Sequence, residues 1–353
     1  MEIASELLPK IKMVAPGTTL RRALDDIVMA EFGALIVFLD DIKEQADILQ
    51  GGFYIGAGFS PERLYELAKM DGAIILDESV SRILAANVQL APDPSLPTNE
   101  TGMRHRAAER MARQTSKFVL TISRRRRVIT LYYKHYKHQL IDITTLIARI
   151  SQTLDTVERH KTILDKKLLR VEEEEFFEQV QLAQVTELIN DGIGILNLLA
   201  DIEPYVVETG IAGHLSSIRL AIVKTDVEAL MQLFVKDYCF QSCSDLEVDK
   251  IIDNIKTVSP SDHVKIAYFL GWDVASEAAI HDIIAKPRGY RFLKQVANIP
   301  PATADKVVET FSDLISLSKA TEEALKEVEG IGEKRAKLIL KGVQQMRNRK
   351  NYL

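Results

Sequence analysis

The stretch YELAKMDGAIIL, residues 65–76, joins two patterns from which the fold of the N-terminal region follows. Upstream, the Ser-Pro pair at 60–61 is typical of a helix start, because serine caps free N–H groups and proline suits the first helical position. Residues 73–76 are apolar and read as a short strand. Asp71 and Gly72 therefore lie where a helix ends and a strand begins. A glycine there lets the backbone approach a ligand closely.

Further strands are expected on both sides of this stretch. Short apolar runs rich in β-branched residues predict them at 34–39, 118–122 and 128–132, and residues 104–114 read as another helix. Strands and helices mixed at this spacing imply an α/β domain, a mixed sheet flanked by helices. We expect this domain to occupy residues 1–140.

The middle of the chain, residues 141–285, has a different pattern. It is almost free of proline, and apolar residues recur at helical spacings. The recurring positions at its start are Ile141, Leu146, Ile150, Leu154 and Val157. We expect an all-α spine without a catalytic constellation, in which Glu172 to Glu175 form a solvated helix face.

The charge of the chain is unevenly distributed. The 353 residues carry a net charge of −5, but residues 286–353 hold 14 Lys and Arg against 8 Asp and Glu. Their balance of +6 leaves −11 on the remainder. A basic tail on an acidic body suggests that only the tail meets a polyanion, although a solvated surface without a partner has the same composition.

Membrane and secretion signals are not expected in this sequence. No apolar run approaches the roughly 20 residues that span a membrane, and the N-terminus lacks a signal-peptide pattern. Cys239 and Cys243, expected in one helix, read as buried free thiols rather than a metal or redox site. A reduced, cytoplasmic setting fits this cysteine usage.

Two further clusters in the first region carry charge. Residues 101–106, Thr-Gly-Met-Arg-His-Arg, begin a helix, and the free N–H groups of a helix start attract anions. Two arginines and a histidine there could cradle a triphosphate, although a basic surface turn explains this cluster equally well by itself. Ser123 ends a strand before four arginines, 124–127, for which a structural turn or a nucleic-acid patch is the default interpretation. Asp71 taken alone is also explained by a surface turn.

Taken together, these clusters resemble the diadenylate cyclase domain. The resemblance rests on Asp-Gly-Ala at 71–73, on ETGMRHR at 100–106, and on the Ala-Pro loop at 91–92 between them. It continues in KTILD, 161–165, and PRGYR, 287–291, which are similar to the spine and linker of DisA, the DNA integrity scanning diadenylate cyclase family. The resemblance therefore covers essentially the whole chain.

Two positions depart from the pattern of that family. Ala107 stands where threonine is usual, so one hydroxyl contact near the nucleotide is missing. Arg124 stands where some relatives have a glutamate that serves the metal. The metal stoichiometry is therefore left open.

The resemblance implies a reaction that needs two copies of the domain. Each would hold one ATP, and the 3′-hydroxyl of each ATP would attack the α-phosphate of the other, giving cyclic di-AMP and two pyrophosphates. The implied catalytic residues are Asp71, Arg104, His105 and Arg106. Asp71 would also bind the cofactor, Mg²⁺ or Mn²⁺. The implied ATP-binding residues are Gly72, Ala73, Leu90, Thr101, Gly102, Met103 and Ser123.

The C-terminal region, 286–353, fits a helix–hairpin–helix pattern. The pattern is formed by Leu325, Val328, Gly330, Ile331, Gly332, Ala336 and Ile339. Its glycines make a tight hairpin whose N–H groups can bind a DNA phosphate, and residues 296–308 resemble a degenerate first copy. The expected DNA-binding residues are Gly330, Gly332, Lys334, Arg335, Lys337 and Lys341. A small helical docking domain that uses its glycines only as turns is the alternative.

These observations lead to one functional hypothesis and two alternatives. We expect a cytoplasmic, nucleoid-associated diadenylate cyclase that also binds branched or junction DNA without sequence specificity, as a sensor of DNA damage. The family resemblance suggests an octamer built from face-to-face cyclase dimers. One alternative is an ATP-sensing DNA-structure-binding protein with little or no cyclase activity, and another is a scaffold with an inactive cyclase domain. The intact Asp71 and residues 104–106 favour the enzyme.

Overall fold

The computed structural model describes residues 5–260 and 262–349. The chain forms two compact units, each made of two segments: Met1–Gln152 with Asp201–Ile218, and Thr153–Ala200 with Arg219–Leu353. These units divide the chain differently from the three domains expected from the sequence. The boundaries near residues 140 and 285 therefore stay a prediction.

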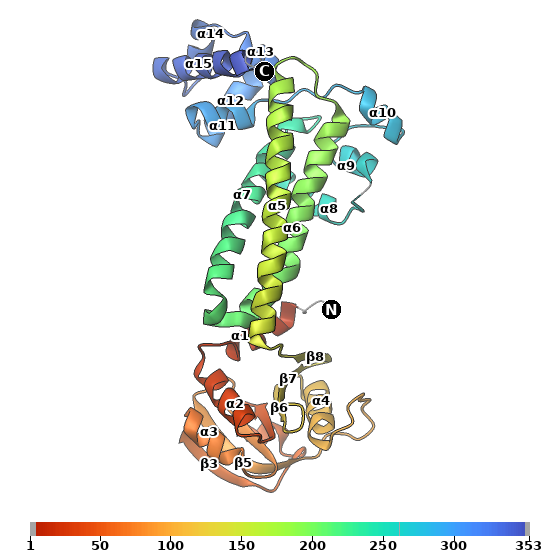
Figure 1. Ribbon diagram of the computed structural model, residues 1–353, viewed down its shortest axis with the longest axis vertical. Coiled ribbons are helices and arrows are strands. Elements are labelled where there is room, and N and C mark those ends of the chain that lie inside the picture. The colour runs from red at the N-terminus through yellow and green to blue at the C-terminus, as the bar shows by residue number, and fades with distance from the viewer. Residues whose placement is uncertain (1–4, 261, 350–353) are drawn as a thin grey trace. The chain divides into compact units, whose positions relative to one another are not determined.

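A mixed eight-stranded sheet forms the centre of the first unit (Figure 1). Its strands are β1 (Ala34–Phe38), β2 (Leu49–Gln50), β3 (Phe53–Gly58), β4 (Ala73–Leu76), β5 (Arg82–Leu90), β6 (Phe118–Ser123), β7 (Val128–Tyr133) and β8 (Tyr136–Gln139). They lie in the order β2-β5-β4-β1-β6-β7-β8, with β3 paired to β5. β1 and β4 pair in parallel, whereas the other pairs are antiparallel. The predicted α/β fold class with a mixed sheet is confirmed.

Helices cover both faces of this sheet. They are α1 (Leu8–Met13), α2 (Thr19–Met29), α3 (Pro61–Leu67) and α4 (Met103–Thr115), with short 3₁₀ turns at Ser5–Leu7, Ile42–Gln45 and Gly210–Gly213. Successive residues of a strand point to opposite faces. Ile36 of β1 accordingly shares a core with Leu24 of α2 and Leu64 of α3, whereas Val37 shares a second core with Met111 of α4.

The local sequence signals explain only part of this sheet. Strands β1, β4, β6 and β7 and helix α4 lie where they were predicted, with ends that agree to within one residue. The Ser60 hydroxyl accepts a hydrogen bond from the Arg63 N–H at 3.2 Å and so caps α3, as expected. Strands β2, β3, β5 and β8 were not predicted. The middle of β5 contains Ala85, Ala86 and Asn87, which have low strand propensity.

Long helices make up most of the middle region, which confirms the predicted all-α spine. They are α5 (Ile143–Glu175), α6 (Leu182–Thr209) and α7 (His214–Tyr238), followed by α8 (Asp245–Lys256), α9 (His263–Phe269) and α10 (Glu277–Asp282). Within the second unit, Lys167 of α5 bonds Glu187 and Asp191 of α6, each at 2.6 Å. Arg219 of α7 bonds Asp155 of α5 at 2.7 Å. Ion pairs thus tie α5 to both neighbouring helices.

Two predictions for this region are wrong. Cys239 and Cys243 do not share a helix, because α7 ends before the first and α8 begins after the second. Both are free thiols, and Cys239 is buried. The acidic run at the end of α5 is not a solvated face throughout, since Glu175 is buried against Arg291. Arg291 lies far from Glu175 in the sequence, so the residues around Glu175 give no sign that its carboxylate is paired and buried.

Among residues 5–260 and 262–349, one helical stretch is long and apolar enough to cross a membrane. Leu182–Tyr238 contains an 18-residue window of mean hydropathy 1.3 with few charges. The expectation that no run comes near this length therefore has one exception. The core helix of a soluble protein meets the same criteria, so the stretch is weak evidence for a membrane span.

Five helices within residues 290–349 form the C-terminal module of the second unit. They are α11 (Tyr290–Ala297), α12 (Pro301–Phe311), α13 (Leu314–Ser318), α14 (Glu322–Lys326) and α15 (Glu333–Arg349). The apolar positions of the predicted hairpin pattern are buried together in one core: Leu325, Val328, Ile331, Ala336 and Ile339. The predicted helix–hairpin–helix fold is confirmed.

Candidate functional site

A cavity of about 870 Å³ opens in the first unit beside β4, β5, β6 and the start of α4. Eight of the residues predicted for the site line it: Asp71, Gly72, Leu90, Gly102, Met103, Arg104, His105 and Ser123. Three others lie outside this lining. Ala73 is buried in the core behind the cavity, and Thr101 and Arg106 are exposed. The structure therefore gathers most of the candidate site from segments that are far apart in the sequence.

Close backbone approach explains the glycines of this cavity. Gly72 has a φ of +87°, and a Cβ there would lie 2.8 Å from the carbonyl carbon of Asn87 in β5. Gly52, which also lines the cavity, has a φ of +80°, and its Cβ would lie 2.7 Å from the Ala86 carbonyl oxygen. Neither position accepts a side chain without a backbone shift. The Gly-Gly pair at 51–52 was the sequence signal for this wall, and the sequence reasoning missed it.

Asp71 and Arg104 meet at this cavity. An Arg104 guanidinium nitrogen lies 3.0 Å from an Asp71 carboxylate oxygen, although 33 residues separate them in the sequence. The Asp71 side chain is 97% exposed and the Arg104 side chain 42% exposed. Because an exposed ion pair contributes little to stability, the pair is better explained by function than by folding. Both groups are free to turn toward a ligand.

The donor set fits a metal that is shared with a nucleotide. Within residues 5–260 and 262–349 no three His, Cys, Asp or Glu side chains come together as metal ligands. Asp71 is the carboxylate that lines the cavity. Mg²⁺ is commonly held by one or two carboxylates, with substrate phosphates and water completing its shell. Asp71 therefore suits an ion that arrives with a polyphosphate, rather than a closed structural site.

His105 lies beside a polar network, although its buried Nε2 has no hydrogen-bond partner in it. The Glu100 carboxylate accepts hydrogen bonds from the Tyr132 hydroxyl at 2.8 Å and pairs with Lys137 at 2.5 Å. The His105 ring meets the Tyr132 ring edge-on at 6.5 Å. Burial lowers the pKa of His105 below its ordinary value, against the opposing charge of Glu100. The imidazole is therefore mostly neutral near pH 7, when it can hold or accept a proton.

Glu100 itself stays ionised in this network. Its burial raises the pKa of the carboxyl, but hydrogen bonds from Lys137 and Tyr132 outweigh burial and leave the pKa below its ordinary value. The negative charge of Glu100 thus remains beside His105 at neutral pH. Sequence reasoning counted Glu100 only as part of the motif and gave it no role.

The remaining wall of the cavity attracts anions. Helix α4 begins after Gly102, which has no side chain to cap the first N–H groups, so these donors and the helix dipole face the cavity mouth. Ala107 and Arg124, the two departures from the family pattern, both line the cavity. Arg124 adds positive charge to this wall. A polyphosphate is therefore the ligand class that this wall favours.

The second hairpin of the C-terminal module has the geometry expected for phosphate binding. Gly330 adopts a φ of +95°, which only glycine takes readily. Gly332, with open space where a Cβ would lie, precedes the first residue of α15. The predicted basic residues Lys334, Arg335, Lys337 and Lys341 all lie on α15. Arg335 donates to the Gly330 carbonyl oxygen at 2.8 Å and steadies the turn.

Three family models match successive parts of the chain. Residues 21–136 match the model described as DisA bacterial checkpoint controller nucleotide-binding, and residues 140–279 match the DisA bacterial checkpoint controller linker region. Residues 290–345 match a SAM-like helix–hairpin–helix tandem. The three models together match the chain in successive parts from residue 21, in α2, to residue 345, in α15.

Curated relatives match over nearly the full length. A protein of Thermotoga maritima named DNA integrity scanning protein DisA is 43% identical over 99% of this chain and 98% of its own length. One of the same name from Thermotoga petrophila is 45% identical over 99% of both chains. One of that name from Bacillus subtilis is 40% identical over 97% of this chain and 94% of its own length.

Proposed function

The chain belongs to the DisA family, and from that premise we propose that it condenses two ATP molecules into cyclic di-AMP and two pyrophosphates. The observation that carries the proposal is the cavity in which Asp71, Arg104, His105 and Ser123 meet. Its volume of about 870 Å³ lies within the range of ligand pockets. A carboxylate, cationic side chains and a helix start are the groups that phosphoryl transfer requires.

Different residues of the cavity position different parts of the bound ATP. Arg104 and the start of α4 hold the phosphates, with Ser123 beside them, and Leu90 packs against the base. His105, packed edge-on against Tyr132 and kept neutral by burial, donates its ring N–H to a phosphate oxygen. When bound, Mg²⁺ or Mn²⁺ supplies charge neutralisation at the α-phosphate and lowers the pKa of the attacking hydroxyl. Asp71 is the residue that would hold that ion.

The reaction requires a second copy of the chain. Cyclic di-AMP has two equivalent halves, so two sites must face each other across a two-fold axis. The 97% exposure of Asp71 supports this arrangement, because a second domain can still cover the carboxylate. We propose a face-to-face dimer as the catalytic unit.

A larger assembly is supported by the surface of α7. Leu215, Ile218 and Ile222 are exposed and follow one another at spacings of three and four residues, so they share one helical face. An apolar stripe of this kind is typical of an interface. We propose that such stripes join dimers into a closed octamer, in which several C-terminal modules act on DNA together.

DNA binding is assigned to the C-terminal module, with branched DNA as the proposed ligand. We propose that Gly330, Gly332 and the basic residues of α15 contact DNA phosphates, which carry no base sequence. Recognition is therefore of backbone geometry. We further propose that junction DNA lowers the cyclase rate and that the protein acts in the cytoplasm at the nucleoid.

Incubation with ATP and Mn²⁺, followed by chromatography, tests the enzyme directly. Wild type should yield cyclic di-AMP, and Asp71→Asn should lose at least about 100-fold of the rate, since it removes the charge that would hold the metal. Asp26→Asn, on the exposed face of α2, is the matched control and should keep full activity. ATP binding without any product would instead favour an ATP-sensing DNA-binding protein.

A further inference from the structure

The C-terminal module contains two hairpins that superpose in sequence at an offset of 32 residues. Asn298 in the first hairpin and Gly330 in the second are both left-handed, with φ of 43° and 95°. The residues that follow them, Ile299 and Ile331, are both buried. Ala304 and Ala336, six positions after the turn residue, are also both buried. The two hairpins therefore have the same backbone plan.

Their hydrogen-bond donors differ at the turn. The second hairpin has N–H groups at Gly332 and at Glu333, where α15 begins. The equivalent residues of the first hairpin are Pro300 and Pro301, and proline has no N–H group. The N–H of Thr303, two residues on, already donates to the Pro300 carbonyl oxygen at 2.9 Å. The first hairpin thus lacks two of the donors with which such a turn binds phosphate.

The charges differ in the same sense. At the same offset, the four basic residues of the second hairpin correspond to Ala302, Thr303, Asp305 and Glu309 in the first. Two neutral and two acidic residues replace four cations. At these four positions the second hairpin therefore offers a phosphate backbone more positive charge than the first.

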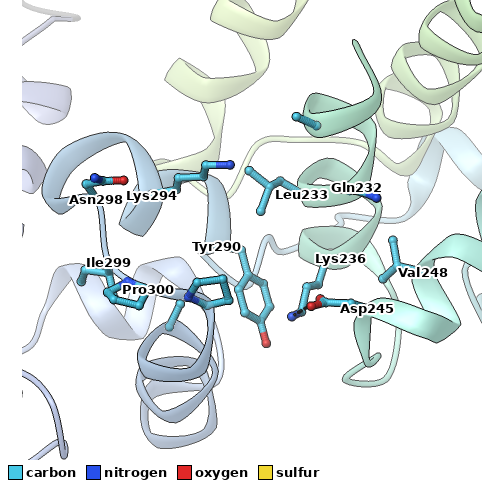
Figure 2. Close-up of a pocket in the computed structure, with 13 residues that line it drawn as sticks. Gln232, Leu233, Lys236, Asp245, Val248, Tyr290, Lys294, Asn298, Ile299 and Pro300 are labelled. Atoms are coloured by element: carbon cyan, nitrogen blue, oxygen red, sulfur yellow. Dashed lines mark hydrogen bonds and ion pairs between the residues drawn. The ribbon is translucent and has the colours of Figure 1, made fainter. Parts of the chain in front are cut away.

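The first hairpin borders a cavity shared with the spine, although Asn298, Pro300 and Pro301 at its turn remain exposed. Figure 2 shows Ile299 and Pro300 across a cavity from Leu233 of α7 and Val248 of α8. This cavity, of about 550 Å³, is lined by both the hairpin and the two spine helices. The walls of this cavity are largely apolar, and Pro300 and Pro301 belong to them. The prolines of the first hairpin therefore form part of the apolar surface that lies opposite the spine helices.

A buried lysine links the same two surfaces. The Lys236 ammonium lies 3.0 Å from Asp305 of the first hairpin and 2.8 Å from Asp245 of α8. Its side chain is 8% exposed, and its ammonium lies 4.5 Å from the centre of the Tyr290 ring. Asp305 stands where the second hairpin has Lys337. The carboxylate that replaces a lysine at this position, and so disfavours a DNA phosphate, therefore makes a contact with the spine.

A second buried contact anchors the start of the module. The Asp237 carboxylate accepts hydrogen bonds from the N–H groups of Gly289, Tyr290 and Arg291. The Arg291 guanidinium bonds Asp237 at 2.7 Å and also pairs with Glu175. Helix α11, which leads into the first hairpin, is therefore fixed to the ends of α5 and α7.

We propose that the first hairpin is a protein-docking element that seats the module on α7 and α8, and that the second hairpin alone binds DNA phosphate. The DNA part of this inference rests on the proposed function, whereas the docking part does not. Each chain then contributes one phosphate-binding hairpin, the second. DNA bound there acts on the spine through the contacts that the first hairpin makes with α7 and α8.

A charge-matched pair of variants tests the DNA part on the full chain. Lys334→Glu on the second hairpin and Lys294→Glu on α11 change the charge equally, and both lysines are exposed. Measured by fluorescence anisotropy with junction DNA, Lys334→Glu should weaken binding about tenfold or more and reduce the salt dependence. Lys294→Glu should change it less than about threefold, because only long-range charge is altered. Equal losses from the two variants would overturn the assignment.

A distance measurement tests docking without DNA. Spin labels on the exposed Lys250 of α8 and Gln344 of α15, in a chain with Cys239→Ala and Cys243→Ser, should give a narrow distance distribution. Asp305→Lys should broaden it, because two ammonium groups then oppose each other. Glu309→Lys, one turn further along α12 and exposed, makes the same charge change and should leave it narrow.

The outcomes separate the two proposals. A wild-type distribution as broad as that of Asp305→Lys, or no effect of Asp305→Lys, overturns the docking role. If the wild-type chain binds no DNA, the proposed function fails, while the distance measurement still decides whether the first hairpin docks on the spine.

Discussion

Replacing Gly72 by alanine should damage the cyclase site through the backbone alone. Two effects add in this variant. An L-residue at a left-handed φ costs about 1–2 kcal/mol, and Gly72 has a φ of +87°. A Cβ there would also lie 2.8 Å from the Asn87 carbonyl carbon, so β5 must shift. Overpacking of this kind costs about 1–3 kcal/mol. We expect the free energy of unfolding to fall by about 3 kcal/mol.

Gly51→Ala is the control that separates strain from contact. Gly51 lines the same cavity and has a φ of +62°, but nothing lies within 4 Å of its Cβ position. It should lose only the strain, about 1–2 kcal/mol. Urea unfolding measures both losses.

The effect on catalysis should separate the two variants further. Asp71 is the neighbour of Gly72, so a shift of this backbone by about 1 Å would misplace the carboxylate and lower turnover by about 100-fold. Gly51→Ala should keep turnover within about fivefold of wild type. Equal stability losses in the two variants, or wild-type turnover in Gly72→Ala, would refute the reasoning.

The remaining predictions concern pH, the buried arginine and DNA. Because burial lowers the pKa of His105, the unfolded chain takes up its proton first, so wild type should lose stability as pH falls below about 6.5; unfolding from pH 7 to 5 should show a smaller loss for His105→Gln. Arg291→Leu should cost about 3–5 kcal/mol in urea unfolding, because it leaves Glu175 and Asp237 unpaired; a loss below 1 kcal/mol would contradict this. Deleting residues 286–353 should remove most DNA affinity and keep basal cyclase activity, and full-length binding should weaken steeply with salt; binding that survives the deletion would assign DNA contact elsewhere.

The sequence alone predicted the strands that carry strong local signals. Residues 73–76 and 118–122 are β-branched or apolar and flanked by turn residues, and both form strands. Strand β5 was not predicted from the sequence, because Asn87 and its alanine neighbours have no strand preference of their own. Pairing with β3 and β4 holds that segment extended, which is a tertiary effect.

Motif spacing likewise identified most of the candidate site, but not its geometry. The motifs at 71–73 and 101–106 named the residues, and the sheet brought Asp71 to 3.0 Å from Arg104. Glu100 and Gly52 were passed over, because their roles depend on what lies opposite them in space. A carboxylate beside a histidine has no signature along the chain when the hydroxyl that orients it comes from residue 132.

The C-terminal module shows the same division most clearly. Sequence by itself determined that two hairpins follow each other and that a proline and two carboxylates stand in the first where the second has a glycine and two lysines, because these are properties of residue types. Only the tertiary structure decided what the altered hairpin does. Asp305 meets Lys236, and Arg291 meets Glu175, across 69 and 116 residues. A buried charge is tolerated only beside its partner, and that partner is chosen by the fold rather than by neighbours in the chain.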